Sequence, residues 1–261
     1  FIGLEFAATY AQFGTKVTVI DVTEAFLPRE DEDVAQAVKE QLEALGVTFN
    51  LGVQLKAVHQ EGGKAVVEAT TGEGAPVAFT TDAVLVATGR RANVQGLDLD
   101  KAGVELTERG AIKVNEFLQT NVPHIFAMGD VNGGPQFTFV SLDDFRIVKR
   151  FLAGDTTYST KQRAKFPTAT FINPPLASVG LNEKQAKEAG IEVKVAKLPA
   201  MAIPKAKILG NQVGFYKVLV DASTNQIVGA TLFDEEAHEV INIIATAMNA
   251  NLPYTVLRDQ I

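Results

Sequence analysis

Hydrophobic and polar positions at the start of the chain alternate between helix-like and strand-like patterns. Apolar residues over 4–12 predict a helix that ends at Gly14, because glycine tolerates the positive φ of a helix C-terminus. Residues 16–21 (KVTVID) are apolar on both faces, which is typical of a strand buried between layers of helices. A second helix is predicted to end near Gly46, because one apolar stripe runs along it at Val34, Val38, Leu42 and Leu45.

Strand patterns follow this second helix. Val47 to Phe49 predicts a strand, and residues 53–79 have the pattern of an antiparallel ribbon with turn sequences at 61–63 and 71–74. The apolar run 82–89 (DAVLVATG) predicts a buried strand that ends in a glycine turn. Residues 1–89 therefore form one predicted α/β unit.

The rest of the chain divides into a loop-rich segment and an α+β segment. Residues 90–162 contain a predicted short strand at 125–128 and a helix over 141–152. In residues 163–261 helices and strands are segregated, as in an α+β domain. Asn182 is expected to cap a short helix that ends at Gly190, strands are expected near 167–171, 178–179, 193–198, 214–220 and 227–233, and four aromatic residues are expected in the core: Phe166, Phe171, Phe215 and Phe233.

Composition excludes several classes of function. The 261 residues are 46% hydrophobic and carry a formal charge of −7 without a basic run, which argues against nucleic acid as a partner. The sequence contains no cysteine and three scattered histidines, so disulfides, thiolate catalysis, Cys-ligated zinc and a His-rich metal site are excluded within it. The acidic run 30–33 precedes a helix and is explained by the helix dipole better than by a metal.

Membrane and export signals are absent from the pattern. No apolar stretch reaches the roughly 18 residues that a membrane-spanning helix needs, and no basic leader precedes a cleavage site. We therefore expect a cytoplasmic protein without a membrane partner.

Gly3 and Asp21 have the spacing of a dinucleotide-binding fingerprint. A glycine at a helix N-terminus lets backbone N–H groups approach a pyrophosphate, and an acid about 20 positions later accepts hydrogen bonds from the adenosine ribose. Gly3 would be the last glycine of that fingerprint, and the first two would precede residue 1. An ordinary helix start followed by an acidic strand end has the same pattern, so these residues alone leave both readings open.

Two further segments favour the first reading, ATGRRAN (87–93) and IFAMGDVNGG (125–134), and the pattern continues through FINPPLASVGLNEKQAKEAG (171–190) and GFYKVLVDASTNQIVGATLF (214–233). With these in order, the chain resembles the flavin-dependent pyridine nucleotide-disulfide oxidoreductases, which include glutathione reductase, lipoamide dehydrogenase and mercuric reductase. The resemblance implies a Rossmann-like NAD(H)-binding domain at 1–89, the C-terminal part of an FAD-binding domain at 90–162 and an α+β dimerisation domain at 163–261.

The resemblance also implies a nicotinamide nucleotide site. Gly3 and the neighbouring N–H groups, including that of Ile2, would meet the NAD pyrophosphate, and Phe1 would be the aromatic gate between nicotinamide and flavin. Glu5 matches a glutamate near the nicotinamide, although a glutamate in a first helical turn also has a purely structural explanation. Asp21 stands where NAD-preferring members have an acid, so NADH is expected over NADPH, with Lys16 and Arg29 as nearby cations that would weaken this preference. Gly89 belongs to the turn that leaves this domain.

The flavin site implied by the resemblance centres on Asp130, which would accept hydrogen bonds from the ribityl hydroxyls of FAD. Gln136, Phe137 and Thr138 match the stretch along the flavin edge. An aspartate in a plain turn is the alternative explanation for Asp130. The sequence SLDD at 141–144 departs from the small apolar helix usual in the family and, with LPRED (27–31) and LPYTVLRDQI (252–261), resembles the branch of bacterial hypothiocyanous acid and reactive-chlorine-response reductases.

The catalytic groups of the family are not found in this sequence. Its redox cysteine pair would precede Phe1 and its His-Pro segment would follow Ile261, so the chain is expected to be a C-terminal portion, inactive alone, of a homodimeric enzyme that uses FAD and NADH to reduce a small-molecule oxidised substrate. Two alternatives stay open: a non-catalytic nucleotide-binding and dimerisation module, and an NADH oxidase or peroxidase of the same superfamily.

Overall fold

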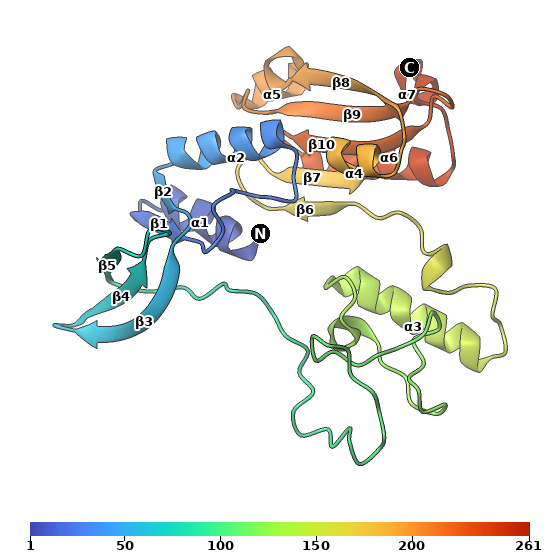
Figure 1. Ribbon diagram of the computed structural model, residues 1–261. Coiled ribbons are helices and arrows are strands. Elements are labelled where there is room, and N and C mark those ends of the chain that lie inside the picture. Colours follow the sequence, from blue (N-terminus) through green and yellow to red (C-terminus); the bar gives the residue numbers. More distant parts are fainter. The chain divides into compact units, whose positions relative to one another are not determined.

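The computed structural model describes residues 1–261, which divide into two compact units (Figure 1). The larger unit combines residues 1–87 with residues 165–261, and the smaller unit comprises residues 88–164. Each unit has its own secondary-structure elements and its own apolar core.

The larger unit begins with two helices and two strands in alternation. These are α1 (Ile2–Gln12), β1 (Val17–Ile20), α2 (Glu32–Ala44) and β2 (Val47–Asn50). Strands β1 and β2 are parallel, as expected when a helix connects them. The predicted stripe of α2 is confirmed, since Val34, Val38 and Leu42 are fully buried.

The predicted antiparallel ribbon is also confirmed. Strands β3 (Gln54–Glu61), β4 (Lys64–Thr70) and β5 (Pro76–Thr81) form one antiparallel sheet in chain order. Gly62 and Gly63 make the first turn with φ of 57° and 81°, a conformation that side chains with a Cβ disfavour.

The strand predicted at 82–89 is wrong. This segment forms no strand, and Val84, Leu85 and Val86 are 39%, 52% and 74% exposed. The physical reason is that a strand exists only through hydrogen bonds to a neighbour, and the parallel sheet of the described chain consists of β1 and β2 alone. The apolar segment 82–89 therefore has no neighbouring strand with which to form hydrogen bonds.

Residues 165–261 build a five-stranded antiparallel sheet with the order β6-β7-β10-β9-β8. Its strands are β6 (Thr168–Thr170), β7 (Leu176–Gly180), β8 (Val193–Pro199), β9 (Phe215–Asp221) and β10 (Ile227–Phe233). The helices are α4 (Glu183–Glu188), α5 (Pro204–Leu209), α6 (Ala237–Asn249) and α7 (Tyr254–Arg258).

Alternate residues of this sheet contribute to two different cores. Leu232 packs in the core formed with α6, whereas its neighbour Phe233 packs in the core formed with α1 and α2. Helices α1 and α2 thus pack directly on the α+β sheet, and one apolar core joins residues 1–87 to residues 165–261.

Two local predictions in this sheet have opposite outcomes. Asn182 caps α4 through a capping box with Gln185, as the sequence predicted. The prediction that Phe171 is a core residue is wrong, because its side chain is 61% exposed and its ring lies edge-on to that of His238. Phe215 and Phe233 are buried as predicted.

The smaller unit has little regular structure. It contains the 3₁₀ turn η1 (Gly129–Asn132), the helix α3 (Thr138–Leu152) and the 3₁₀ turn η2 (Thr160–Gln162). The strand predicted at 125–128 is wrong, since only Phe126 forms a single bridge, to Gln119, and no second strand continues the pairing. Small apolar clusters around Ile112 and Ile147 form the core of this unit.

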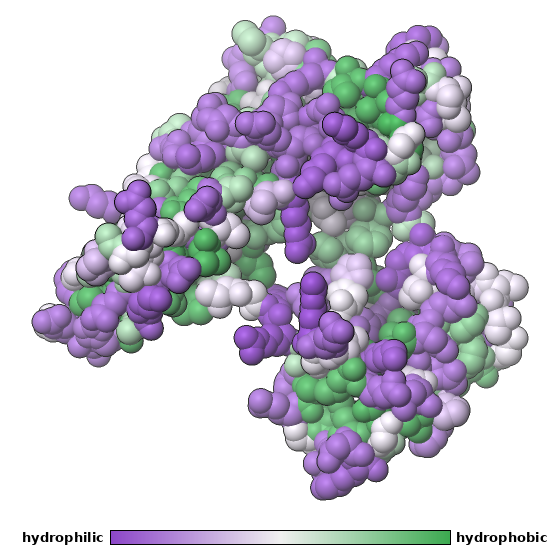
Figure 2. All heavy atoms as spheres, viewed as in Figure 1, coloured by the Kyte–Doolittle hydropathy of each residue, from purple (hydrophilic) through white to green (hydrophobic).

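Hydrophobic side chains reach the surface of both units (Figure 2). On α1 these include Phe6 and Tyr10, and on α3 they include Leu142 and Phe145. None of the helices is long and apolar enough to cross a membrane.

Candidate functional site

The first group of predicted site residues lies at the N-terminus of α1. Phe1 is the N-cap residue and makes no side-chain hydrogen bond to the helix, so no side chain satisfies the first N–H groups, those of Ile2 and Gly3. The loop from α1 to β1 is short, so α1 runs antiparallel to β1 and its N-terminus lies at the carboxyl edge of that strand. This edge is where open α/β sheets bind nucleotides.

Gly3 is closely approached by the segment that leaves the α/β unit. A Cβ added to Gly3 would lie 3.4 Å from the Cβ of Ala87, so the residue that precedes the Thr88-Gly89 turn passes the helix N-terminus. Gly89 itself has a φ of 105°, which only glycine adopts readily. A small residue at position 3 therefore permits this crossing.

Glu5 is engaged with the α+β sheet. Its Oε1 atom accepts a hydrogen bond of 2.8 Å from the backbone N–H of Phe171. This contact supports the structural explanation of Glu5, because it ties the first turn of α1 to the chain just after β6. It occupies one carboxylate oxygen.

Asp21 follows β1 and is held in a fixed orientation. Its Oδ1 atom accepts from the backbone N–H and from the hydroxyl of Thr23, both at 2.8 Å, in a local Asx turn. The residue is exposed at the carboxyl end of the strand. An oriented, exposed carboxylate of this kind is suited to accept hydrogen bonds from hydroxyl groups of a ligand.

Asp130 projects from η1 in the smaller unit. Its side chain is 47% exposed, and its Oδ2 atom lies 3.6 Å from Nη1 of Arg90. Gly129 precedes it with a φ of 75°, and a Cβ at Gly129 would come within 2.8 Å of the Ser141 hydroxyl. The turn is therefore packed tightly against α3 while the Asp130 carboxylate remains accessible.

Gln136, Phe137 and Thr138 connect this turn to α3. Phe137 is the N-cap residue of the helix, and its ring stacks on that of Phe139 at 5.1 Å. Gln136 and Thr138 are exposed. Asp130 and this stretch thus lie on the two sides of one glycine-containing loop.

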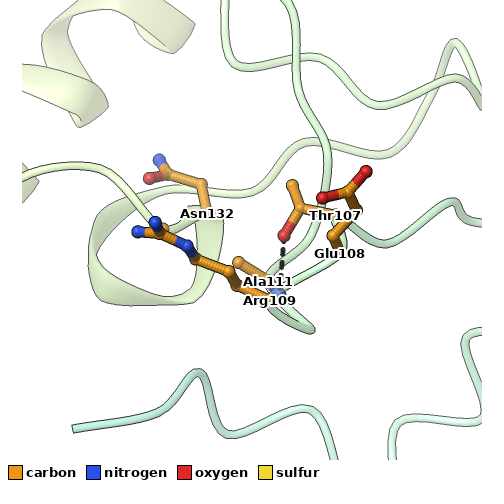
Figure 3. Close-up of a pocket in the computed structure, with 6 residues that line it drawn as sticks. Thr107, Glu108, Arg109, Ala111 and Asn132 are labelled. Carbon is orange, nitrogen blue, oxygen red and sulfur yellow. Dashed lines mark hydrogen bonds between the residues drawn. The ribbon is translucent and has the colours of Figure 1, made fainter.

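A pocket of about 380 Å³ flanks the same turn (Figure 3). It is lined by Asn132 and Gly133 on one side and by the loop of Thr107, Glu108, Arg109 and Ala111 on the other. The Thr107 hydroxyl accepts a hydrogen bond of 3.1 Å from the N–H of Ala111, which closes this loop. Side chains of both charge signs lie at the pocket, so its charge alone selects no class of ligand.

Two buried charges near these groups were not anticipated from the sequence. Asp144 of α3 is 2% exposed and contacts the η1 turn, and Lys217 of β9 is 1% exposed. The signal for Lys217 was a lysine within an apolar strand pattern, because lysine is rarely fully buried without a partner. The signal for Asp144 was the unusual SLDD sequence, whose local pattern identifies no partner.

The dipole explanation for the acidic run 30–33 is incomplete. Asp31 is the N-cap residue of α2 but makes no capping bond, and its carboxylate instead lies 2.8 Å from Nζ of Lys217. Asp33 and Glu183 converge on the same nitrogen, at 2.8 Å and 2.5 Å. The three carboxylates that could together hold a metal ion therefore surround a lysine.

Comparison with known proteins identifies the family. The family model of the pyridine nucleotide-disulphide oxidoreductases matches residues 1–144, and the model of their dimerisation domain matches residues 166–261. The chain belongs to the pyridine nucleotide-disulphide oxidoreductase family. The larger unit accordingly contains a Rossmann-type domain joined to the family's dimerisation domain.

Individual members of the family align with nearly the whole chain. RclA of Escherichia coli strain K12, a pyridine nucleotide-disulfide oxidoreductase by name, is 42% identical over 261 residues, which are 100% of this chain and 58% of RclA. The mercuric reductase of Staphylococcus aureus is 35% identical over 99% of this chain and 47% of its own length. The chain thus spans about half the length of the curated relatives it matches.

Solved structures agree with this assignment. The HOCl-induced flavoprotein disulfide reductase RclA from Escherichia coli superposes with a TM-score of 0.94 at 40% identity, over 100% of this chain and 59% of that chain. LpdA from Mycobacterium tuberculosis superposes with a TM-score of 0.89 at 25% identity, over 100% of this chain and 56% of that one. The chain is therefore similar to RclA, a flavoprotein disulfide reductase by name, over its whole length in both sequence and structure.

Proposed function

We propose that the chain provides the NADH-binding domain, part of the FAD site and the dimer interface of an enzyme that transfers electrons from NADH through FAD to a disulfide or a reactive oxidant. The observation on which this proposal depends is the match to RclA along all 261 residues, at 42% identity. Residues 1–89, 90–162 and 163–261 are the proposed NAD(H), partial FAD and dimerisation domains. The chain itself contains no cysteine, so it contributes no redox thiol.

NADH is the proposed donor because of the carboxylate at Asp21. The uncapped N-terminus of α1 presents the N–H groups of Ile2 and Gly3 to the pyrophosphate. Asp21, oriented by Thr23, accepts from the ribose hydroxyls and repels the 2′-phosphate of NADPH. Phe1 is 54% exposed beside these groups, where its ring can cover the nicotinamide.

Glu5 is assigned a different part of the same site. One of its oxygens is occupied by the N–H of Phe171, so the carboxylate both anchors α1 to the α+β sheet and presents its other oxygen near the nicotinamide. Gly89 completes the site as the turn that leaves the nucleotide-binding domain, with a φ of 105°.

FAD is the proposed electron carrier, and when bound it accepts a hydride from the nicotinamide and passes the electrons on in pairs. The residues at η1 fit a ribityl chain, because Asp130 is an exposed acceptor on a turn whose flanking glycines, Gly129 and Gly133, allow the positive φ values that the turn requires. Gln136, Phe137 and Thr138 line the flavin edge. These residues would bind and orient the cofactor through non-covalent contacts.

Homodimer formation is proposed through residues 163–261, which match the family's dimerisation domain over 166–261. Interfaces of permanent homodimers commonly bury more than about 2,000 Å², and the five-stranded sheet with its helices offers a rigid surface for such an interface.

The proposal is tested on the protein encoded by the intact coding sequence. We expect G-x-G-x-x-G and C-x-x-x-x-C segments upstream of Phe1, a yellow protein with one FAD per chain, and flavin bleaching by NADH under anaerobic conditions. A single upstream cysteine would instead favour an NADH oxidase or peroxidase. A complete protein without a second glycine fingerprint, without flavin and without NADH oxidation would leave a nucleotide-binding and dimerisation module and refute the enzyme.

A further inference from the structure

The helix that follows the η1 turn has a buried carboxylate directed at that turn. Asp144 lies in the middle of α3 and is 2% exposed, although it has acidic Asp143 as its neighbour and belongs to the SLDD sequence that departs from the family pattern. A buried carboxylate is costly unless each of its oxygens has donors. The donors present therefore show what Asp144 holds.

One oxygen of Asp144 binds both ends of the turn. Oδ2 accepts from the backbone N–H of Gly129 at 2.8 Å and from the side-chain amide of Asn132 at 3.0 Å. Asn132 also donates to the carbonyl of Ala127 and accepts from the N–H of Gly134 at 2.9 Å. Asp130 lies between the two residues that Asp144 fixes, so the direction of its carboxylate depends on this anchor.

The other oxygen of Asp144 has a cationic partner. The Arg163 guanidinium contacts Asp144 Oδ1 and also donates from Nε to Asp143 at 2.7 Å. Asp143 in turn accepts a hydrogen bond of 2.9 Å from the Tyr158 hydroxyl. Arg163 is 13% exposed at its side chain, so the charge of Asp144 is neutralised within the protein rather than by water.

These contacts separate the roles of the two neighbouring acids. Asp143 contacts only Arg163 and Tyr158, whereas Asp144 contacts Arg163 and the turn. If Asp144 only held Arg163 in place, it would need no hydrogen bond to Gly129. Its bond to the N–H of Gly129 instead holds the residue whose positive φ of 75° shapes the turn. Oδ2 of Asp144 therefore holds the conformation of the turn.

We propose that Asp144 is a positioning residue of the flavin site: it fixes the Gly129–Asn132 turn so that Asp130 meets the ribityl hydroxyls, with Arg163 as its counterion. This inference rests on the proposed function, because it requires that Asp130 binds FAD. Asparagine cannot replace Asp144, because the two oxygens of Asp144 both accept hydrogen bonds, whereas the amide of asparagine has one acceptor oxygen and one donor group. Either the turn or Arg163 would face an N–H group.

The test uses the intact protein, stripped of FAD and titrated with FAD while flavin fluorescence is followed. Asp144→Asn is expected to raise the dissociation constant of FAD roughly ten- to a hundredfold, because hydrogen bonds to a charged group are lost. The matched control is Asp143→Asn, which loses an ion pair to the same Arg163 but no bond to the turn, and its affinity should stay within about threefold of wild type. The thermal midpoint of each FAD-free protein is measured alongside.

A second variant covers the case in which Asp144→Asn does not fold. Asn132→Ala breaks the same tether without leaving a buried charge, and it should weaken FAD binding roughly three- to tenfold with little change in the midpoint of the FAD-free protein. Wild-type affinity in Asp144→Asn or in Asn132→Ala would overturn the inference, as would equal losses in Asp143→Asn and Asp144→Asn. A wild-type intact protein without FAD would overturn the proposed function as well, whereas normal FAD content in wild type and variants would overturn the inference alone.

Discussion

Lys217 offers the sharpest test of how the nucleotide-binding residues are joined to the dimerisation sheet. Its ammonium group lies 2.8 Å from Asp31, 2.8 Å from Asp33 and 2.5 Å from Glu183, and the residue is 1% exposed. Asp31 and Asp33 lie at the start of α2, whereas Lys217 lies on β9 and Glu183 on α4. One cation therefore neutralises carboxylates from both parts of the larger unit.

Replacing Lys217 by methionine keeps the apolar stem and removes only the charge. Loss of one partner from a buried ion pair costs about 3–5 kcal/mol, because the remaining charge is left without compensation. Asp31 is 9% exposed at its side chain, but Asp33 is 38% and Glu183 is 49% exposed, so water reaches two of the three carboxylates. We therefore expect the lower end of the range, a loss of about 3 kcal/mol in the free energy of unfolding.

The measurement is urea unfolding of the 261-residue chain, followed by far-UV circular dichroism and fitted with one transition for each compact unit. Lys197→Met is the matched control. Lys197 shares Asp33 at 2.7 Å and lies over the Phe215 ring at 3.6 Å, but its side chain is 41% exposed. Removing an exposed pair and an exposed cation–π contact should cost about 1 kcal/mol.

Equal costs for Lys217→Met and Lys197→Met would refute the reasoning. A further arm adds Asp31→Asn to Lys217→Met, which removes the buried charge that the first substitution left unpaired. The double variant should recover part of the lost stability, because the two side chains interact directly. Strictly additive losses would contradict a coupled cluster.

The pH dependence of this cluster has a defined sign. Burial raises the pKa of Asp33, but hydrogen bonds and charges from Lys197 and Lys217 outweigh the burial and leave its pKa below the ordinary value. Burial lowers the pKa of Lys217, but its three carboxylate partners outweigh that effect and raise its pKa. A lowered carboxyl pKa stabilises the fold above about pH 4, and a raised lysine pKa does so below about pH 10. The stability difference between wild type and Lys217→Met should therefore be constant from about pH 6 to 9 and decrease below about pH 4; a change across the neutral range would contradict the assignment.

Four other predictions concern ligand binding and stability. In the intact protein, Asp21→Arg should raise the ratio of kcat/KM for NADPH over NADH at least about tenfold, and an unchanged ratio would remove Asp21 from the ribose site. Asp130→Ala should lower the FAD retained per chain after gel filtration, and normal flavin content would reject its role. The 261-residue chain alone should be purified without colour; one bound FAD per chain would disprove a shared flavin site. Burial raises the pKa of Asp234, so the folded state binds a proton that the unfolded state has released, and stability falls as the pH rises between the two pKa values. Asp234→Asn should thus be more stable than wild type at pH 7 but not at about pH 3 by urea unfolding, and a gain that persists in acid would contradict this cause.

Elements with a strong local signal were predictable from the sequence. The spacing of Val34, Val38 and Leu42 predicted α2, and all three side chains are fully buried. Asn182 predicted the start of α4, where the capping box with Gln185 is present. In these cases the deciding interactions lie within one or two helical turns, so the residues that form the element also specify it.

Elements that depend on a distant partner were not predictable in the same way. The run 82–89 has the composition of a buried strand, yet it has no neighbour to pair with and its apolar side chains are exposed. Phe171 lies next to β6, but its N–H binds Glu5, 166 residues away, and its ring remains exposed. The composition of a segment determines which secondary structures it can form, and its neighbours in the fold determine which one it forms.

The candidate site shows the same division. Gly3, Asp21 and Asp130 could be proposed as binding residues from the sequence, because ligand chemistry imposes residue types at fixed spacings. Asp144 was not, because it contacts Gly129 and Arg163 across 15 and 19 residues, separations with no period of their own. Lys217 contacts Asp31 across 186 residues.

Asp144 and Lys217 are both charged residues at positions where the local pattern requires an apolar residue. A charge in such a position is costly, so its presence predicts a compensating partner even when the partner is unknown. In this chain the two compensated charges lie where separate segments meet: Lys217 joins α2 and α4 to the sheet, and Asp144 joins α3 to the turn that bears Asp130. A charge that breaks the local pattern is therefore a marker for residues that hold separate segments together, whereas fixed spacing is a marker for the residues proposed to touch a ligand.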